Sequence, residues 1–369
     1  MIKKILFILI IVLYQNNLYS KTNENKFFNQ RYLYNYFSAL LSFSNQDNKK
    51  TIKFFESNKK IINKSENLIK KYILSLSVEG KIEKAIKYIE RNEGNNKFEF
   101  LEANLLLYSR AIVEKDFLKA KNHISKIKKF EDEGTFEMII SKAIQSYNHL
   151  FLNSEIKQND YNLGKLGLVN RAFQECYIGS GKEQNFFLNL INSEDGDYSR
   201  YIFFYLNILI NNEDIITAKS LASTINELES NLLILQSKRW IEREEYKNFS
   251  QYFSCKSEAD LISEFFFIIA NLYSSQEQYE KSNFYLSISN YLNKKFIFNN
   301  SLVAENFFLI EEYDKAKYIL NKFDKKFDIY FWYKIKKIGQ IISFNKNNTE
   351  PINFIEDNFI KIRDPSFKI

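Results

Sequence analysis

Few residues in this chain could carry out chemistry. The 369 residues include only two histidines and two cysteines. Neither His123 nor His149 has a second histidine, a cysteine or a carboxylate pair at the spacing of a metal site or a catalytic triad. Residues 179–182, Gly-Ser-Gly-Lys, lack the other residues of a phosphate-binding P-loop, and residues 194–197 lack most ligands of a calcium loop. We therefore predict no catalytic residues, no metal and no cofactor, and we expect turns at both segments.

The composition favours helices as the elements that position the side chains. The chain has 35 Phe and 24 Tyr but only 9 Gly and 2 Pro. A sandwich, a barrel or a doubly wound sheet needs many more turn-forming residues, so we predict an all-α fold. The formal charge of +7 comes mainly from lysine. Because phosphate recognition favours arginine, this charge is weak evidence for nucleic acid, and we predict no nucleic-acid partner.

The N-terminus has the layout of a secretory signal peptide. Lys3 and Lys4 precede an unbroken apolar run over residues 5–14, and a polar stretch leads to Ser20. The run is about half of the ~20 residues that span a bilayer, and no cysteine follows it for a lipid anchor. We predict a signal peptide at residues 1–20, a short polar linker at 21–30, and export to the periplasm or cell envelope without a permanent membrane span. An uncleaved membrane tether is the alternative, and peripheral membrane contact stays open.

The rest of the chain contains a repeat. A polar turn is followed by an apolar helix whose fourth residue is usually small, as in EGKIEKAIKYIE and NEDIITAKSLAS. A degraded copy is expected at about 135–165, and a further copy near Glu350, before Pro351. We predict about ten units over residues 31–363, with the start of an unfinished helix or a tail at 364–369. The anchor positions of the clearer copies are Thr51, Ala85, Ala120, Asn185, Ala218, Phe249, Ser282 and Ala316.

The pattern resembles the tetratricopeptide repeat (TPR) family, whose units are 34-residue helix-turn-helix pairs. One unit matches at Ala270, Tyr273 and Tyr279, and the next matches at Ala304 and Phe307. Other units depart from it, since Phe249 stands where a small residue is usual and the characteristic proline is missing. The resemblance implies an α-solenoid of stacked antiparallel helix pairs that winds as a right-handed superhelix. An irregular helical domain is the alternative.

The same register bears on the cysteines and tryptophans. Cys176 and Cys255 are 79 residues apart. If stacked units rise by about 10 Å each, the pair exceeds the ~7 Å Cα separation of a disulfide. We therefore expect two buried thiols, although an oxidising compartment would permit a bridge. Trp240 and Trp332 lie in apolar runs, which predicts core packing.

The resemblance also implies a binding surface. In TPR proteins the first helix of each unit lines a concave groove, and asparagine amides there can hold a peptide backbone through paired hydrogen bonds. Asparagine is common throughout this chain, so its presence at these positions is also expected by chance. The positions that correspond to the groove are Arg200, Phe203, Asn207, Asn211, Glu264, Phe267, Asn271, Phe298, Glu305 and Phe308.

Together these features predict a non-enzymatic, exported scaffold or adaptor that binds a protein or peptide on its concave surface. The alternative is a helical accessory subunit, or a truncated part, of a peptidoglycan-active envelope enzyme. A helical-repeat protein that binds nucleic acid is a third hypothesis, which the signal peptide disfavours.

Overall fold

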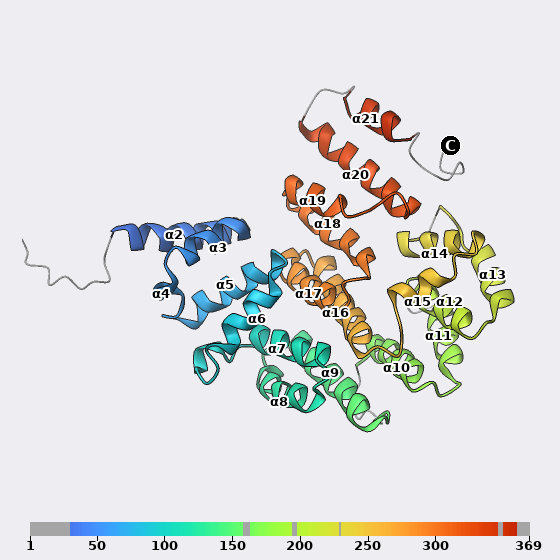
Figure 1. Ribbon diagram of the computed structural model, residues 1–369, viewed down its shortest axis with the longest axis horizontal. Helices are drawn as coiled ribbons and strands as arrows, with labels where there is room; N and C mark the ends of the chain where they lie inside the picture. The colour runs from blue at the N-terminus through green and yellow to red at the C-terminus, as the bar shows by residue number, and fades with distance from the viewer. Residues whose placement is uncertain (1–29, 158–162, 194–197, 229, 346–349, 360–369) are drawn as a thin grey trace, which may run out of the picture. The chain divides into compact units, whose positions relative to one another are not determined.

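The computed structural model describes residues 30–157, 163–193, 198–228, 230–345 and 350–359. The predicted signal peptide, nearly all of the linker, residues 194–197 and the predicted tail at 364–369 lie outside these residues. The described part of the chain is all-α and contains no β-strand, which confirms the predicted fold class (Figure 1). None of its helices is long and apolar enough to cross a membrane.

The chain divides into two compact units, Met1–Ser75 and Leu76–Ile369. The first contains α2 (Gln30–Ser44), α3 (Asn48–Glu56), α4 (Lys59–Ile62) and most of α5 (Glu66–Val78). Helices α2 and α3 form a pair. Phe55 of α3 packs edge-on against Tyr72 of α5, and the Tyr72 hydroxyl donates a 2.9 Å hydrogen bond to Glu56.

The second unit consists mainly of consecutive helix pairs, with the long helix α9 (Thr135–Asn153) standing alone where the degraded copy was expected. Short 3₁₀ turns occupy Asn96–Phe98, Lys128–Phe130 and Ile297–Asn299. The remaining helices, in chain order, are α6 (Ile82–Glu90), α7 (Leu101–Val113), α8 (Phe117–Ile127), α10 (Lys165–Ile178), α11 (Glu183–Ile191), α12 (Tyr201–Asn211), α13 (Ile215–Ser223), α14 (Leu232–Glu242), α15 (Lys247–Tyr252), α16 (Glu258–Ser275), α17 (Tyr279–Leu292), α18 (Asn300–Leu309), α19 (Tyr313–Leu320), α20 (Asp328–Asn345) and α21 (Glu350–Phe359).

One turn recurs between the two helices of most pairs. At the α7–α8 turn, Lys115 has a φ of 57° and the Asp116 amide donates to the Ala111 carbonyl at 2.9 Å. This six-residue bond is that of a Schellman motif, which satisfies a carbonyl at the end of the first helix. The Asp116 carboxylate then accepts the Lys119 amide and caps the next helix. The same backbone bond is donated by Asp47, Lys81, Asp214, Glu245, Gln278 and Glu312.

The predicted anchors are buried with one exception. Thr51, Ala85, Ala120, Ala218, Phe249, Ser282 and Ala316 are fully buried where two helices cross. Asn185 is exposed, so its assignment as an anchor was wrong. Because α11 begins at Glu183, the repeat register there is displaced and Phe187 is the buried residue. Helix α21 begins at Glu350, near the expected position of the last copy, but Glu350 itself is exposed and the buried residue is the next one, Pro351.

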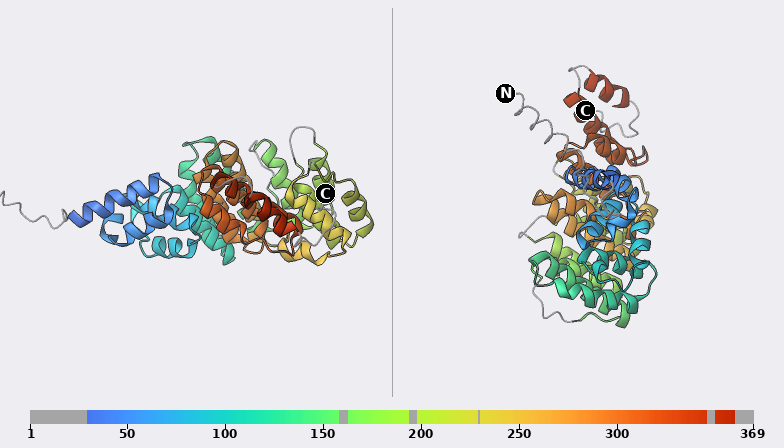
Figure 2. Two further views of the ribbon diagram at one scale, coloured as in Figure 1. Left: turned by 90° about the horizontal axis from the view of Figure 1, so that it is seen from above. Right: turned by 90° about the vertical axis from the view of Figure 1, so that its left-hand side faces the viewer.

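The second unit folds back on itself. Helix α16 packs against α7 and α9, α17 packs against α6 and α7, and α14 packs against α20 (Figures 1 and 2). Aromatic side chains form part of these contacts, since the ring centres of Tyr273 and Phe136 lie 4.7 Å apart and those of Phe265 and Tyr147 lie 6.3 Å apart. Units distant in sequence therefore share one core, whereas a simple stack joins only neighbours. The right-handed sense of winding stays a prediction.

The return of the chain explains a wrong prediction. Cys176 in α10 and Cys255, just before α16, form a disulfide with a Cα separation of 5.7 Å. The expectation of free thiols assumed straight stacking, but the fold brings α10 beside the start of α16. Next to the bridge, Lys256 donates to the Tyr177 carbonyl at 2.6 Å, and the Tyr177 hydroxyl donates to Glu258 at 2.9 Å.

Both tryptophans pack as predicted. Trp240 is fully buried and lies against Phe249, Tyr252 and Phe298. Trp332 is half-buried and packs beside the C-terminal cluster around Phe331. Residues 179–182 form the turn between α10 and α11, as expected.

Candidate functional site

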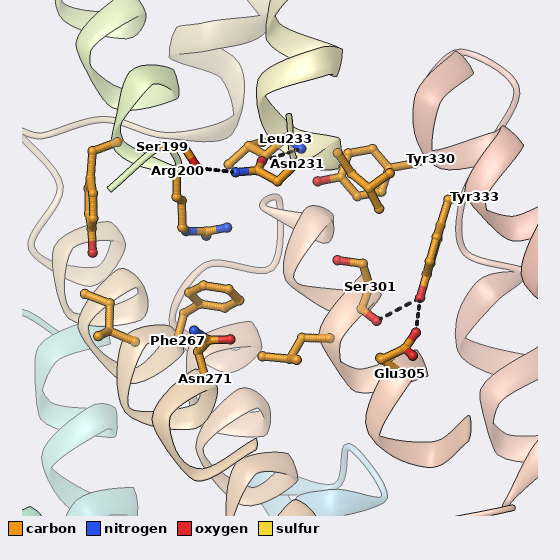
Figure 3. A pocket seen from close by; sticks show the side chains of 14 residues that line it. Ser199, Arg200, Asn231, Leu233, Phe267, Asn271, Ser301, Glu305, Tyr330 and Tyr333 are labelled. Atoms are coloured by element: carbon orange, nitrogen blue, oxygen red, sulfur yellow. Dashed lines mark hydrogen bonds between the residues drawn. The ribbon is translucent and has the colours of Figure 1, made fainter. Parts of the chain in front are cut away.

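A hollow of about 400 Å³ lies between the first helices of five successive pairs, and we call it the groove hollow (Figure 3). These helices are α12, α14, α16, α18 and α20, the elements that the repeat register predicts on a concave surface. The lining therefore has the same structural origin in each unit. It comprises Ser199, Arg200, Tyr201, Asn231, Leu232, Leu233, Phe267, Ile268, Asn271, Ser301, Leu302, Glu305, Tyr330 and Tyr333.

Arg200 is the central charged residue of the groove hollow. Its guanidinium donates to both carboxylate oxygens of Glu264, with Nε to Oε1 at 2.7 Å and Nη2 to Oε2 at 2.8 Å. Nη2 also donates to the Asn299 side-chain oxygen at 2.8 Å. The guanidinium carbon lies 3.6 Å from the centre of the Phe267 ring, so the planar group stacks on an aromatic face (Figure 3). Both the orientation and the charge of Arg200 are thus fixed before any ligand arrives.

The burial of this pair has an electrostatic consequence. The Glu264 side chain is 2% exposed, and the Arg200 side chain is 19% exposed. Burial raises the pKa of the Glu264 carboxyl above its ordinary value, while the Arg200 guanidinium opposes that shift by favouring the carboxylate. Removing Arg200 alone would leave an acid in a dry environment without compensation.

A second paired charge closes the other side of the groove hollow. Glu305 accepts hydrogen bonds from the Tyr333 hydroxyl at 3.1 Å and from the Lys337 ammonium, which lies 2.8 Å from Oε2. Lys337 lies 4.2 Å from the centre of the Phe308 ring. Burial raises the pKa of Tyr333, and the neighbouring Glu305 carboxylate adds to the shift. Tyr333 therefore stays protonated and acts as a donor.

Some polar groups of the lining have no such partner inside the protein. Asn271 is exposed, and no hydrogen bond of its side chain occurs within the described part of the chain. The Tyr330 hydroxyl also has no protein partner there, and burial raises its pKa, so it stays protonated. An amide and a hydroxyl can both donate and accept, which suits a ligand with peptide-like groups.

The structure brings four of the ten predicted residues, Arg200, Phe267, Asn271 and Glu305, into the lining of this hollow. Glu264 and Phe308 lie behind the lining, against Arg200 and Lys337.

The other predicted residues have structural roles. Phe203 and Phe298 are at most 1% exposed and belong to the aromatic core, so their predicted exposure on a groove was wrong. Asn207 is buried too, because its amide donates to the carbonyls of Phe249 and Phe253 at 3.2 and 3.0 Å. Asn211 is exposed and donates to the Asn207 side chain at 2.6 Å.

Sequence reasoning missed part of the lining. Tyr330 and Tyr333 belong to the last pair, in which the repeat pattern has faded. Asn231 caps α14 by accepting the amides of Leu233 and Ile234. An Asn directly before an apolar helix is a recognisable capping signal that could have placed it.

The described residues contain no group of three or more His, Cys, Asp or Glu side chains that could hold a metal ion. Comparison of the chain with protein-family models, with curated proteins and with solved structures finds no match.

Proposed function

We propose that this chain is an exported, non-enzymatic scaffold of the tetratricopeptide type that binds a protein or peptide partner in the groove hollow. The observation that carries the proposal is the origin of the lining, since the first helices of five successive pairs contribute to one hollow. Four lining residues stand at positions that the repeat register assigns to partner contact: Arg200, Phe267, Asn271 and Glu305.

Recognition would depend on shape and hydrogen bonds. The Arg200 guanidinium on Phe267 forms a flat platform, and Asn271 and Tyr330 offer groups that match peptide N–H and C=O. Because the charges are already paired within the protein, little ordering of these side chains is needed on binding. Preorganisation of this kind reduces the entropy lost in the complex.

The disulfide supports the proposed export. Cys176 and Cys255 are the only cysteines of the chain, and they are joined. Disulfides form and persist in oxidising compartments and are rare in the cytosol. The bridge therefore agrees with the compartment that residues 1–20 predict.

Blocking the groove hollow tests the proposal. Asn271→Arg places a bulky charged side chain in the hollow from an exposed position, while Asn212→Arg makes the same change at an exposed residue after α12. From gently crosslinked cells, we expect the wild type to co-purify one stoichiometric partner from the envelope fraction. Asn271→Arg should reduce its recovery at least tenfold, and Asn212→Arg should not.

Two results would contradict this proposal. Equal recovery with both variants would exclude the groove hollow as the binding site. Absence of any stoichiometric partner from the folded wild type, in every cell fraction, would exclude the scaffold function.

A further inference from the structure

A second hollow, of about 500 Å³, lies on a different part of the same compact unit, and we call it the lysine hollow. Its walls come from the turn between α5 and α6, the end of α17, the 3₁₀ turn before α18, and from α18 and α19. It shares no lining residue with the groove hollow. Three lysines line it, Lys294, Lys315 and Lys322.

Each of these lysines stands over an aromatic ring. The ammonium nitrogens of Lys294 and Lys322 lie 5.6 and 5.8 Å from the centres of Tyr291 and Tyr318. Lys315 lies 5.5 Å from the Phe307 ring and 3.6 Å from the Glu312 carboxylate. Within the described part of the chain, Lys294 and Lys322 form no ion pair. Two positive charges therefore face this hollow without a protein carboxylate to compensate them.

The acidic residues of the lining do not change this balance. Glu83 is engaged by Arg110, whose Nη1 lies 2.9 and 2.8 Å from the two carboxylate oxygens. Arg110 also approaches the Tyr291 hydroxyl at 3.3 Å. Glu79 is the other carboxylate of the lining, so its single negative charge is outnumbered by the two unpaired lysines. Desolvation by neighbouring groups lowers the pKa of Lys322, although the side chain is exposed.

An unsatisfied acceptor lines the same hollow. Asn300 is 5% exposed, and its side-chain nitrogen donates to the Ile297 carbonyl at 2.8 Å. Its side-chain oxygen is buried and has no hydrogen-bond partner in the described part of the chain. A buried acceptor in this state costs about 1–3 kcal/mol, which a ligand N–H would recover.

We infer that the lysine hollow binds an acidic peptide segment, with carboxylates at Lys294 and Lys322 and a backbone N–H at Asn300. Apolar side chains of the segment would cover the aliphatic lining, which includes Ile82, Val303 and Ile319.

The chemistry of the lining favours a peptide over a phosphate polymer. No arginine lines the hollow, although arginine's planar fork is the group best suited to phosphate oxygens. Aliphatic walls gain nothing from a polyphosphate, but they gain about 25 cal/mol for each Å² of apolar peptide surface that they cover.

Fluorescence anisotropy with a labelled octapeptide of alternating glutamate and leucine tests the inference on the purified full-length protein. We expect binding at least tenfold tighter than that of the alternating lysine and leucine octapeptide, and a steep loss of affinity as salt rises. The variant Lys294→Gln/Lys322→Gln should weaken binding at least tenfold. The variant Lys121→Gln/Lys128→Gln has the same net charge, and since its exposed lysines lie on α8 and just after it, binding should change less than twofold. Circular dichroism and thermal melting verify that all variants fold.

Two further variants separate the parts of the inference. Asn300→Leu should weaken the peptide severalfold by removing the acceptor, whereas the neutral change Asn212→Leu, at an exposed residue after α12, should leave it unchanged. Equal losses of octapeptide affinity in the two double-lysine variants would show that net charge alone causes the binding, and this result would overturn the proposed site. Tighter, lysine-dependent binding of inorganic polyphosphate would replace the peptide by a phosphate ligand, and no binding of the octapeptide would overturn the inference outright.

Discussion

The two hollows of the second compact unit differ in how their charges are balanced. In the groove hollow, Arg200 is paired with Glu264 and Lys337 with Glu305. In the lysine hollow, Lys294 and Lys322 have no carboxylate partner in the described part of the chain. The charged side chains of the groove hollow are therefore paired before a ligand binds, whereas two lysines of the lysine hollow are not.

This difference separates two modes of recognition within one repeat array. A hollow with paired charges gains affinity from fit and hydrogen bonds, so its binding should depend little on salt. A hollow with unpaired lysines attracts an anionic partner from a distance, and salt screens that attraction over about 8–10 Å. The same helix-pair scaffold can therefore hold two kinds of partner on different surfaces.

The largest expected effect comes from breaking a paired charge and comparing it with an unpaired one. Arg200→Met leaves the buried Glu264 carboxylate without compensation, and we expect it to lower the free energy of unfolding by up to about 5 kcal/mol. Lys322→Met removes a charge that no carboxylate needs, so its free energy of unfolding should stay within about 0.5 kcal/mol of the wild type. Urea unfolding at pH 7, followed by the fluorescence of Trp240 and Trp332, measures both. Equal losses in the two variants would contradict the difference between the hollows.

Removing the disulfide tests how much the position of α16, which lines the groove hollow, depends on its covalent link to α10. Cys255 directly precedes α16, which carries Glu264, Phe267 and Asn271. Closing a loop of 79 residues restricts the unfolded chain, so Cys176→Ser/Cys255→Ser should lower the free energy of unfolding by about 4 kcal/mol. Dithiothreitol should lower the urea midpoint of the wild type but not that of the double variant. An unchanged wild-type midpoint in reductant would show that packing alone holds α16 in place.

The local architecture could be predicted because its physical cause is local. A small side chain is required wherever two helices of a pair cross, so Ala85, Ala120 and Ala316 mark the 34-residue period in the sequence itself. The prediction failed at Asn185 because no small residue marks the helix crossing there. The neighbouring aromatic residues fit several repeat registers equally well. The turn residues Glu213, Glu244, Glu277 and Glu311 gave no signal, although each adopts a positive φ.

Long-range features could not be predicted in the same way. The disulfide and the packing of α16 on α7 and α9 depend on the curvature summed over many units, which no single repeat specifies. The groove hollow was predictable in part, because Asn271 and Glu305 follow from helix register alone. The positions of Phe203 and Phe298 could not be predicted from register, because an aromatic residue fits either a core or a groove position.

His123 is a titratable group that is buried without a charged partner, in contrast to the paired charges of the groove hollow and the exposed lysines of the lysine hollow. It lines neither hollow, is 5% exposed, and has no hydrogen-bond partner at either ring nitrogen among the residues that the structure describes. Burial, with a smaller contribution from Lys126 and Lys119, lowers its pKa to about 4. The folded state therefore resists protonation, and stability is lost as the pH falls from about 6.5, the unfolded value, towards 4.

We expect this effect to cost about 2 to 3 kcal/mol at pH 4.5 relative to pH 7. His123→Gln does not titrate, so the difference in unfolding free energy between it and the wild type should move in favour of the variant by that amount as the pH falls. Urea unfolding of both proteins at the two pH values provides the measurement. A constant difference would mean that His123 is already hydrated or paired in the folded state.

The smallest expected effect separates stability from binding in the lysine hollow. Glu311 has a φ of 62° in the turn between α18 and α19, a conformation that glycine adopts at less cost. Glu311→Gly should therefore raise the free energy of unfolding by about 1 kcal/mol. The neighbouring Glu312 has a φ of −80°, so Glu312→Gly removes the same charge but should destabilise the protein. Glu312 also lies 3.6 Å from Lys315 in the lysine hollow, so Glu312→Gly should bind the acidic octapeptide more tightly than Glu311→Gly, even though it is the less stable of the two variants. Octapeptide affinities that instead followed the urea midpoints would contradict binding by the lysine charges.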